Sequence, residues 1–569
     1  MTQPAPPTFT ELFTPKLVTV LREGYGLGKF RDDAIAGLTV AIVALPLSMA
    51  IAIASSASPA QGLYTAIVGG FLVSLLGGSR FQIGGPAGAF IVLVAATVAQ
   101  HGMDGLLLAT ILSGLILMAI GFLRLGTYIK FIPYPVTVGF TAGIAVIIFT
   151  SQLKELLGLT LTRPEPGPLL EKLPVLWASL PTLTPAALVL SLATIAIIMG
   201  LKYARPKWPG MLIAVAAASI AAAFLALPVA TIGSAYGGIP GTLPMPALPE
   251  FTAAKVMAVL PSAVAFALLG SIESLLSAVV ADGMTGRRHR SNCELVAQGV
   301  ANIGSGLFGG ICVTGTIART ATNVRAGAHG PVAGMMHAVF LLLFILVAAP
   351  LASFIPLASL AGVLAVVAWN MIEKPAINAL VHSGRGPTAV LLVTFLLTVF
   401  RDLTEAIVVG VALGSVLILR RIATIAAVET RTPFVPEDQP DAIGQNRTAY
   451  ERGTGADPRI VIFHISGAFF FGSAASIGSV LDRMQDQHRA LIIDFTAVPF
   501  LDSTAAYTID SLVRKATARR VYTVLSGTTP NMRRLLSAHG LNAPRVHYAQ
   551  QVKDAMALAT LALNSGSAA

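Results

Sequence analysis

The sequence predicts a polytopic α-helical membrane protein that ends in a small α/β domain. Of its 569 residues, 55% are hydrophobic and only 11% are charged, whereas soluble domains carry about 25% charged residues. The mean hydropathy is +0.77. Long stretches without charge recur as far as residue 400, and strand and helix patterns alternate only after residue 458. The bulk of the chain is therefore expected to lie in a lipid bilayer.

The apolar stretches provide enough length for about fourteen membrane segments at about 20 residues each. Stretches without Asp, Glu, Lys or Arg cover residues 34–79, 81–100, 105–123, 131–153, 173–201, 208–249, 295–318, 326–372 and 386–400. Several of these can hold two crossings. An even number of segments places both termini on the same side of the membrane.

The net charge of +11 is distributed in a way that fits a membrane protein and not a nucleic-acid-binding protein. With fourteen segments, the basic loops fall on the side of the N-terminus, which the positive-inside rule makes cytoplasmic. The residues concerned are Arg22, Lys29, Arg31, Arg124, Lys130, Lys202, Arg205, Lys207, Arg287, Arg288, Arg290, Arg420 and Arg421. Residues 228–249 fall on the opposite side and contain no Lys or Arg.

The chain begins with a cytoplasmic segment at residues 1–33, followed by a first span at about 34–54 and a second at about 62–78. Pro46 lies within the first span. A proline there frees a backbone carbonyl and bends the helix, which a membrane tolerates where protein or a cavity satisfies the freed group. The first span is thus expected to face protein at this point.

The third segment, residues 82–100, is predicted to be a broken helix. Gly84, Gly85, Pro86 and Gly88 precede a short apolar helix. Proline suits the first turn of a helix, and glycine suits irregular backbone.

The tenth segment has the same character at Gly309–Arg325, GGICVTGTIARTATNVR. Its glycines interrupt the span, and a short helix is expected to begin near Thr316. This segment is apolar enough for membrane depth, yet it carries Arg319 and Arg325.

The two broken segments occupy corresponding positions in two halves of seven segments, at about 34–228 and 256–428. An odd number of segments per half inverts the second half relative to the first. The two half-helices would then meet with their N-termini facing one spot, where both dipoles favour an anion. The alternative is that the glycines only permit close helix packing.

A carboxylate in the eighth span, at about 256–281, is the second chemical feature. Glu273 has apolar residues on both sides, and Ser277 shares its helix face one turn later. A carboxylate at this depth is costly unless it faces a cavity or a partner. Glu273 is predicted to couple a proton or a cation to the anion site, with Arg319 as counter-charge; the alternative is a structural Glu–Arg pair.

The composition changes after Arg421. Residues 429–458 are polar and rich in Pro and Gly, which is typical of a linker. Residues 459–569 are predicted to form a small α/β domain with its C-terminal tail. The expected strands are 459–466, 490–496 and 520–527, and the expected helices are 473–487, 503–518 and 530–539.

Several motifs resemble those of the bacterial SulP anion transporters, also called solute carrier family twenty-six. They are GGPAGAF, LGSIESLLSAVVADGMTGRRHRSNCELVAQGVANI and GTIARTATNVRAGA. The C-terminal IIDFTAVPFLDSTAA is similar to the strand–loop–helix motif of the STAS domain that follows the membrane part in that family. The resemblance implies core and gate domains, an elevator-type movement and a homodimer.

The resemblance also implies an anion site between the first span and the starts of the third and tenth segments. Carried over by position, its residues are Leu47, Ile51, Ala87, Gly88, Thr316, Ile317, Ala318 and Arg319. Some members have a polar residue at the position of Leu47 or an aromatic one at Ile51 or Ala87, so this site would depend more on backbone N–H groups.

For the coupling ion, sodium-coupled bicarbonate carriers of the family have an aspartate at the position of Glu273 and a hydroxyl at that of Ser277. A glutamate is similar to members considered proton-coupled. In the STAS domain, antagonist relatives carry a phosphorylatable serine near Ser503. Here capping of the following helix by Ser503 or Asp502 is favoured over regulation by phosphorylation.

These observations predict a proton-coupled symporter of a small anion such as bicarbonate, sulfate or a dicarboxylate, not an enzyme. The alternatives are a sodium-coupled symporter with Na⁺ near Glu273 and Ser277, an uncoupled exchanger or channel, and an anion sensor that signals through the STAS domain. No cofactor or resident metal is expected. The expected setting is a bacterial inner membrane, and a regulatory partner could act on the STAS domain.

Overall fold

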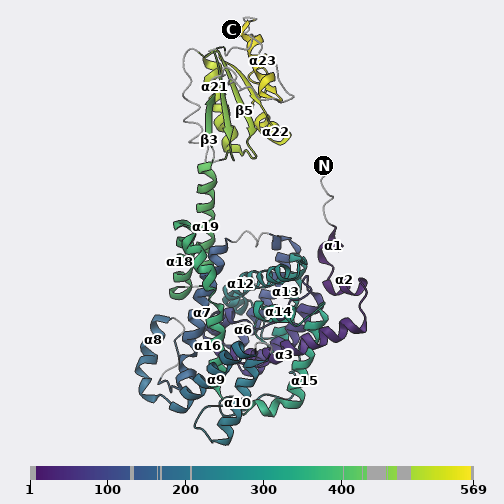
Figure 1. Cartoon of the computed structure of the whole chain (residues 1–569), viewed down its shortest axis with the longest axis vertical. Coiled ribbons are helices and arrows are strands. Elements are labelled where there is room, and N and C mark those ends of the chain that lie inside the picture. Colours follow the sequence, from purple (N-terminus) through teal and green to yellow (C-terminus); the bar gives the residue numbers. More distant parts are fainter. Residues whose placement is uncertain are drawn as a thin grey trace. The chain divides into compact units, whose positions relative to one another are not determined.

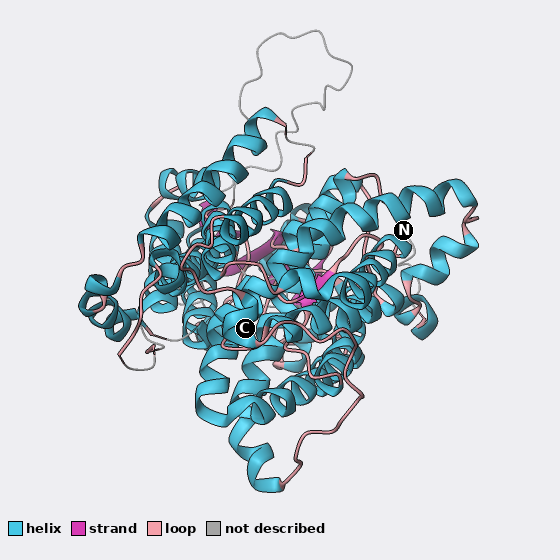
Figure 2. Ribbon diagram, turned by 90° about the horizontal axis from the view of Figure 1, so that it is seen from below, coloured by secondary structure: helices cyan, strands magenta, loops and turns pink. Residues whose placement is uncertain are grey.

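The computed structural model describes residues 8–127, 133–162, 165–166, 169–205, 208–401, 403–425, 427–431, 457, 459–470 and 488–564. The chain forms two compact units, Met1–Ala412 and Leu413–Ala569. Figure 1 draws both and labels their elements. Helices make up most of the structure in Figure 2.

The helical part follows the predicted order of segments. Its first half contains α1 (Phe9–Phe13), α2 (Lys16–Arg22), α3 (Leu27–Ala54), α4 (Pro59–Tyr64), α5 (Gly70–Leu76), α6 (Ile91–Phe122), α7 (Tyr134–Leu157), α8 (Leu169–Ala178), α9 (Pro185–Ala204), α10 (Gly210–Phe224) and α11 (Ile232–Tyr236). Its second half contains α12 (Ala253–Thr285), α13 (Ser291–Leu307), α14 (Ile317–Arg325), α15 (Val332–Ala352), α16 (Leu357–Met371), α17 (Lys374–His382), α18 (Arg385–Phe400) and α19 (Leu403–Ile425). Among the described residues, eight helices are long and apolar enough to cross a membrane.

Helix boundaries differ from the predicted ones where the chain continues a helix across a change of composition. Helix α3 begins at Leu27 and not at residue 34, so the predicted N-terminal segment 1–33 ends in the first turns of this helix. A π-helical turn at Thr65–Gly69 joins α4 and α5 into the second span. In α6, Gly102 has a φ of 70° and kinks the helix between the third and fourth segments, a conformation that glycine adopts without strain.

The two halves pack in a mirrored pattern, which confirms the inverted repeat. Helix α3, the first span, packs on α15 of the second half, and α12, the first span of that half, packs on α6. In the same way α5 packs on α15, and α13 packs on α6. A second group consists of α7, α9, α16 and α18, in which α7 contacts α16 and α18, and α9 contacts α16. These two groups correspond to the expected core and gate.

The broken segments meet in a two-stranded antiparallel sheet, the pairing expected when the second repeat is inverted. Strand β1 (Gly84–Gly85) pairs with β2 (Thr314–Gly315), with Gly84 opposite Gly315 and Gly85 opposite Thr314. After β1, the 3₁₀ turn η2 (Gly88–Phe90) leads into α6. After β2, the chain enters α14. The third and tenth segments therefore start their helices from a shared irregular centre.

The C-terminal unit contains the predicted α/β domain, with three of the expected strands and two of the expected helices. Its sheet has the order β3-β4-β5-β6-β7, in which β3 is antiparallel to β4 and the other pairs are parallel. The strands are β3 (Ala427–Arg431), β4 (Ile460–Ser466), β5 (Ala490–Ala497), β6 (Tyr522–Ser526) and β7 (His547–Ala549), and the helices are α21 (Ser503–Ala518), α22 (Pro530–Ala538) and α23 (Val552–Asn564). The helix predicted at 473–487 lies outside the described residues.

Strand β3 was missed in the sequence. It covers Ala427–Arg431, which overlaps the predicted end of the membrane domain at residue 428 and the start of the predicted linker 429–458. The short sequence AVETR has no run of apolar residues that would identify a strand. Its backbone pairing with the edge of β4 defines it instead.

The two faces of this sheet have separate cores. Residues such as Phe463 and Ile493 pack with Ile509 of α21 and Leu536 of α22. On the opposite face, β-strand residues pack with Ala555 and Ala559 of α23. The connection after β6 thus runs to one face and the connection after β7 to the other.

Candidate functional site

The centre of the site is the crossing of the two broken segments. The hydroxyl and the backbone N–H of Thr316 both donate to the carbonyl of Ile83, at 3.1 and 3.0 Å. Glycine is required in the paired strands because a Cβ at Gly315 would collide with the Gln82 side chain, and a Cβ at Gly85 would collide with Arg319 Nη1. The crossing therefore brings residues from both repeats into direct contact.

Helix α13 supports the irregular backbone with a ladder of polar side chains, consisting of Glu294, Gln298, Asn302 and Ser305. Asn302 exchanges two hydrogen bonds with the backbone of Val313, at 2.9 and 3.0 Å, as a neighbouring strand would. Glu294 is fully buried and accepts from Ser79 N and Gln82 Nε2. An unsatisfied backbone group inside a membrane costs several kcal/mol, about the free energy of its transfer to hydrocarbon. The side chains of this ladder satisfy such backbone groups and thereby hold the broken segments in place.

The start of α14 presents free backbone donors. Its N-cap residue Thr316 provides no side-chain cap, since its hydroxyl bonds to Ile83 instead. Thr320 is the first residue of α14 whose backbone N–H has an acceptor, the Thr316 carbonyl. Within the described residues, the N–H groups of Ile317, Ala318 and Arg319 have no acceptor. Ala318 is exposed and Ile317 partly exposed, so this helix start is open to a ligand.

The start of η2 is similar but has no polar side chain. Ala87 is the N-cap and makes no side-chain hydrogen bond, and the N–H groups of Gly88 and Ala89 have no acceptor among the described residues. A Cβ at Gly88 would lie 3.0 Å from Ile148 Cδ1 of α7 and 3.8 Å from Met371 Sδ of α16. This helix start therefore borders the second helix group.

Arg319 provides the charge of the site. It is 1% exposed, and its Nη2 donates to Ser48 Oγ of α3 at 3.1 Å and to the Pro86 carbonyl at 3.4 Å. Its Nε and Nη1 have no partner among the described residues. A buried guanidinium with two unused donors, next to two uncapped helix starts, favours binding of an anion.

Leu47 and Ile51 of the first span flank this arrangement with apolar surface. They are 7% and 2% exposed and belong to the main core cluster, together with Ala87. Ser48, between them in the sequence, is the residue that contacts Arg319. The first span thus orients the guanidinium through a hydroxyl and excludes water with the neighbouring side chains.

Glu273 is not the partner of Arg319, and the predicted counter-charge is wrong. The Glu273 side chain is 7% exposed, and the structure gives it neither a hydrogen bond nor an ion pair among the described residues. The neighbouring hydroxyls are used elsewhere: Ser277 donates to Thr320 of α14 at 3.0 Å, and Ser274 bonds to Thr314 of β2 at 2.8 Å. Glu273 therefore lies on the helix face that holds the tenth segment, without a fixed partner of its own.

Sequence reasoning missed the residues that hold the site together, above all Ser48, Thr320 and the ladder on α13. A signal was present for the ladder, because polar residues recur at Glu294, Gln298 and Asn302 with a spacing of four inside an apolar stretch. That spacing places them on one helix face. Ser48 and Thr320 are single hydroxyls whose partners lie in distant segments, and their sequence context is uninformative.

In the C-terminal unit, Asp502 caps α21 by accepting from Ala505 N at 2.8 Å. Ser503 is the exposed first residue of that helix. The capping role is therefore filled by Asp502. A regulatory role of Ser503 stays a prediction.

Two family models match the chain. The sulfate permease family model matches residues 30–394, and the STAS domain model matches residues 454–555. The chain is 39% identical to the putative sulfate transporter YvdB of Bacillus subtilis, over 91% of this chain and 95% of that protein. It is 31% identical to the bicarbonate transporter BicA of Picosynechococcus, over 89% of this chain and 90% of that protein.

Solved structures have the same fold. The transmembrane domain of a cyanobacterial bicarbonate transporter BicA matches 67% of this chain and 98% of its own, with a TM-score of 0.60 and 32% identity. Murine Slc26a9 in the inward-facing state matches 98% of this chain and 96% of its own, with a TM-score of 0.84 and 18% identity. At 18% identity, the match with Slc26a9 shows a common fold and no more.

Proposed function

The chain belongs to the sulfate permease family, with a C-terminal STAS domain, and we propose that it is a proton-coupled symporter of a small anion. The substrate class comprises bicarbonate, sulfate and small dicarboxylates. Relatives named as sulfate and bicarbonate transporters support this class. Its substrate site is formed by Arg319, the N–H groups of 317–319 and those of Gly88 and Ala89.

One observation carries the proposal: two uncapped helix starts and a half-satisfied buried guanidinium converge at one crossing. The donors of Arg319 Nε and Nη1 have no protein partner among the described residues. An unpaired buried charge is strongly destabilising. A bound anion would supply the missing acceptors, so binding of the substrate and stability of the site go together.

The coupling proton is assigned to Glu273. A buried carboxylate without a partner is unfavourable when ionised, and protonation removes that cost. Glu273 is one residue from Ser274 and one turn from Ser277, which hold β2 and α14 respectively. A change in its charge would therefore act on the segment that carries Arg319. A sodium ion at Glu273 and Ser277 is the alternative coupling ion.

We assign transport itself to a movement of the group formed by α3–α6 and α12–α15 against α7, α9, α16 and α18. Gly88 supports this assignment because it lies at the border between the two groups. It has no side chain, and a Cβ at this position would lie only 3.0 Å from Ile148 Cδ1. A homodimer in the bacterial inner membrane, with both termini in the cytoplasm, is the setting we propose from the family resemblance and the basic loops.

The purified protein reconstituted in liposomes provides the test. Uptake of labelled bicarbonate, sulfate and succinate would be measured with an imposed proton gradient, with an imposed sodium gradient and with neither. We expect accumulation of one of these anions only with the proton gradient. Accumulation with the sodium gradient alone would assign the coupling to sodium, and binding without uptake would identify a sensor.

Glu273→Gln separates coupling from substrate binding. We expect this variant to lose uptake driven by the proton gradient and to retain exchange of the anion across the membrane, because the amide cannot carry a proton. The matched control is Glu171→Gln, at an exposed position on α8. Undiminished gradient-driven uptake in Glu273→Gln would contradict the proton-carrier role.

A further inference from the structure

A carboxylate, an imidazole and a hydroxyl are linked where α12 ends and α13 begins. Asp282 lies in the last turn of α12, Ser291 is the first residue of α13, and His289 lies in the connection between them. Asp282 Oδ2 accepts a hydrogen bond from His289 Nδ1 at 2.7 Å, and His289 Nε2 lies 3.0 Å from Ser291 Oγ. The proposed transport cycle uses none of these three side chains.

The partners of the imidazole determine the role of each ring nitrogen. An ionised carboxylate only accepts hydrogen bonds, so Nδ1 of the neutral His289 ring carries the hydrogen that is shared with Asp282. Nε2 is then an acceptor, and the donor that it meets is the Ser291 hydroxyl. A hydroxyl that donates to an imidazole oriented by a carboxylate is the arrangement that activates serine as a nucleophile.

The backbone around the imidazole holds this arrangement in place. Asp282 Oδ2 also accepts from the backbone N–H of His289 at 3.1 Å. Gly286, with a φ of 70°, ends α12 and donates to the Asp282 carbonyl at 2.8 Å. The N–H of Arg290 donates to the Gly78 carbonyl at 2.9 Å. The connection is thus fixed on both sides of His289, and the three groups are in contact before any reactant is bound.

The Ser291 hydroxyl does not serve as a helix cap. The N-cap residue of α13 is Arg290, and it provides no side-chain hydrogen bond. The backbone N–H groups of Asn292 and Cys293 have no acceptor among the described residues. In serine acyl-transfer sites, the N–H of the residue after the nucleophile is one of the donors that stabilise the oxyanion. The N–H of Asn292 has the corresponding place here.

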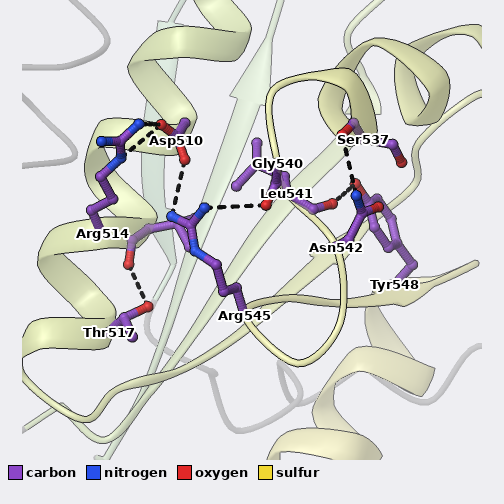
Figure 3. Close-up of polar contacts among 10 residues, drawn as sticks. Asp510, Arg514, Thr517, Ser537, Gly540, Leu541, Asn542, Arg545 and Tyr548 are labelled. Carbon is purple, nitrogen blue, oxygen red and sulfur yellow. Dashed lines mark hydrogen bonds and ion pairs between the residues drawn. The ribbon is translucent and has the colours of Figure 1, made fainter.

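Two carboxylates of the C-terminal unit provide a comparison. Asp494 accepts from His464 Nδ1 at 2.5 Å, but His464 Nε2 has no hydroxyl partner within the described ranges. Asp510 is paired with Arg514 and Arg545 (Figure 3). Each of these contacts satisfies a buried carboxylate and ends there. At the start of α13, in contrast, the contact continues from the imidazole to a hydroxyl.

The surface beside Ser291 is basic. Ser291 is partly exposed, and Arg287 and Arg288 in the same connection are exposed. Neither arginine forms an ion pair with a described residue. Arginines next to a nucleophile favour a reactant that carries a phosphate group. An acyl phosphate combines such a group with an activated carbonyl.

We propose that Ser291 is a nucleophile that takes an acyl group from an acyl phosphate. Ser291 Oγ forms a bond to the acyl carbon while its proton passes to His289 Nε2. The bond between the acyl carbon and the phosphate oxygen then breaks, and phosphate leaves with the electron pair and takes up the proton from His289. The products are an ester of Ser291 and inorganic phosphate. This reaction does not depend on the anion transport proposed above.

A fluorophosphonate probe tests the reactivity of the hydroxyl in the full-length protein in lipid nanodiscs. Attack by Ser291 forms an O–P bond and releases fluoride, and mass spectrometry of the peptides identifies the labelled residue. We expect label on Ser291 and none on Ser503, an exposed serine to which the structure gives no imidazole partner within its described ranges. Absence of label from Ser291 would overturn the proposal.

A second sample receives acetyl phosphate. We expect the Ser291 peptide to gain an acetyl group. Fluorophosphonate label without acetylation would support the nucleophile and overturn the acyl-phosphate donor.

Variants of His289 distinguish a general base from a structural residue. A general base contributes about 10²- to 10⁴-fold, so in His289→Ala we expect labelling of Ser291 to fall at least about 100-fold and added imidazole to restore part of it. His289→Gln, which keeps more of the side-chain volume, should show the same loss. His382→Ala, at the exposed end of α17, is the matched control and should label as the wild type does. Undiminished labelling in both His289 variants, or a loss that imidazole does not restore, would overturn the role of His289.

Discussion

The third and tenth segments have the same backbone construction but different chemistry. Both pass through a short extended stretch, pair with each other in β1–β2 and start a helix without a side-chain cap. The tenth segment adds a hydroxyl at Thr316 and a guanidinium at Arg319, whereas the third provides only Ala87 and Gly88 at the corresponding place.

This difference indicates which properties the two inverted repeats share and which differ between them. Inversion preserves the dipoles and the free N–H groups of both helix starts, since these depend on backbone geometry. Side chains are free to diverge. Here the tenth segment supplies charge, and the third supplies close approach to Ile148 and Met371 of the opposite helix group.

The largest expected effect concerns the charge of the tenth segment. Arg319→Gln removes a buried cation, and hydrogen bonds to charged groups contribute about 1.5–3 kcal/mol, so we expect anion uptake to fall about 10- to 100-fold. The measurement is initial uptake into liposomes against substrate concentration. Arg325→Gln, at the exposed C-terminal end of α14, is the control; an equal loss in both variants would remove the special role of Arg319.

A smaller effect is expected from the contact that joins the two segments. In Gly85→Ala the new methyl group would occupy the place of Arg319 Nη1, so the guanidinium must shift, and we expect uptake to fall about tenfold. Gly283→Ala, where a Cβ meets no atom within 4 Å, is the control. If both substitutions act through the guanidinium, adding Gly85→Ala to Arg319→Gln should cause little further loss; fully additive losses would show that Gly85 acts independently of Arg319.

The smallest effect is expected at the third segment's helix start. In Gly88→Ala the new Cβ would lie 3.0 Å from Ile148 Cδ1, the end of a flexible side chain that can move aside. We expect about a threefold decrease in the uptake rate, with little change in anion affinity, since no donor is lost. A decrease in affinity as large as that of Arg319→Gln would show that the two helix starts contribute equally.

Much of the architecture follows from local sequence patterns. Apolar stretches located the membrane segments, glycine clusters at 84–88 and 309–315 located both breaks, and strand–helix alternation located the C-terminal domain. These features are local because hydrophobic length, backbone freedom and side-chain periodicity act over a few residues. The family motifs added the correspondence between Arg319 and the anion site.

The partners of the buried polar groups were decided by the tertiary structure alone. Arg319 bonds to Ser48, 271 positions away in the chain, and not to Glu273 as its chemistry suggested. The Asn302 side chain accepts a hydrogen bond from the backbone N–H of Val313, and β3 is a strand because it pairs with β4. Local sequence indicates that a buried charge needs partners, but packing between distant segments selects them, because several donors and acceptors of the right type compete for each position.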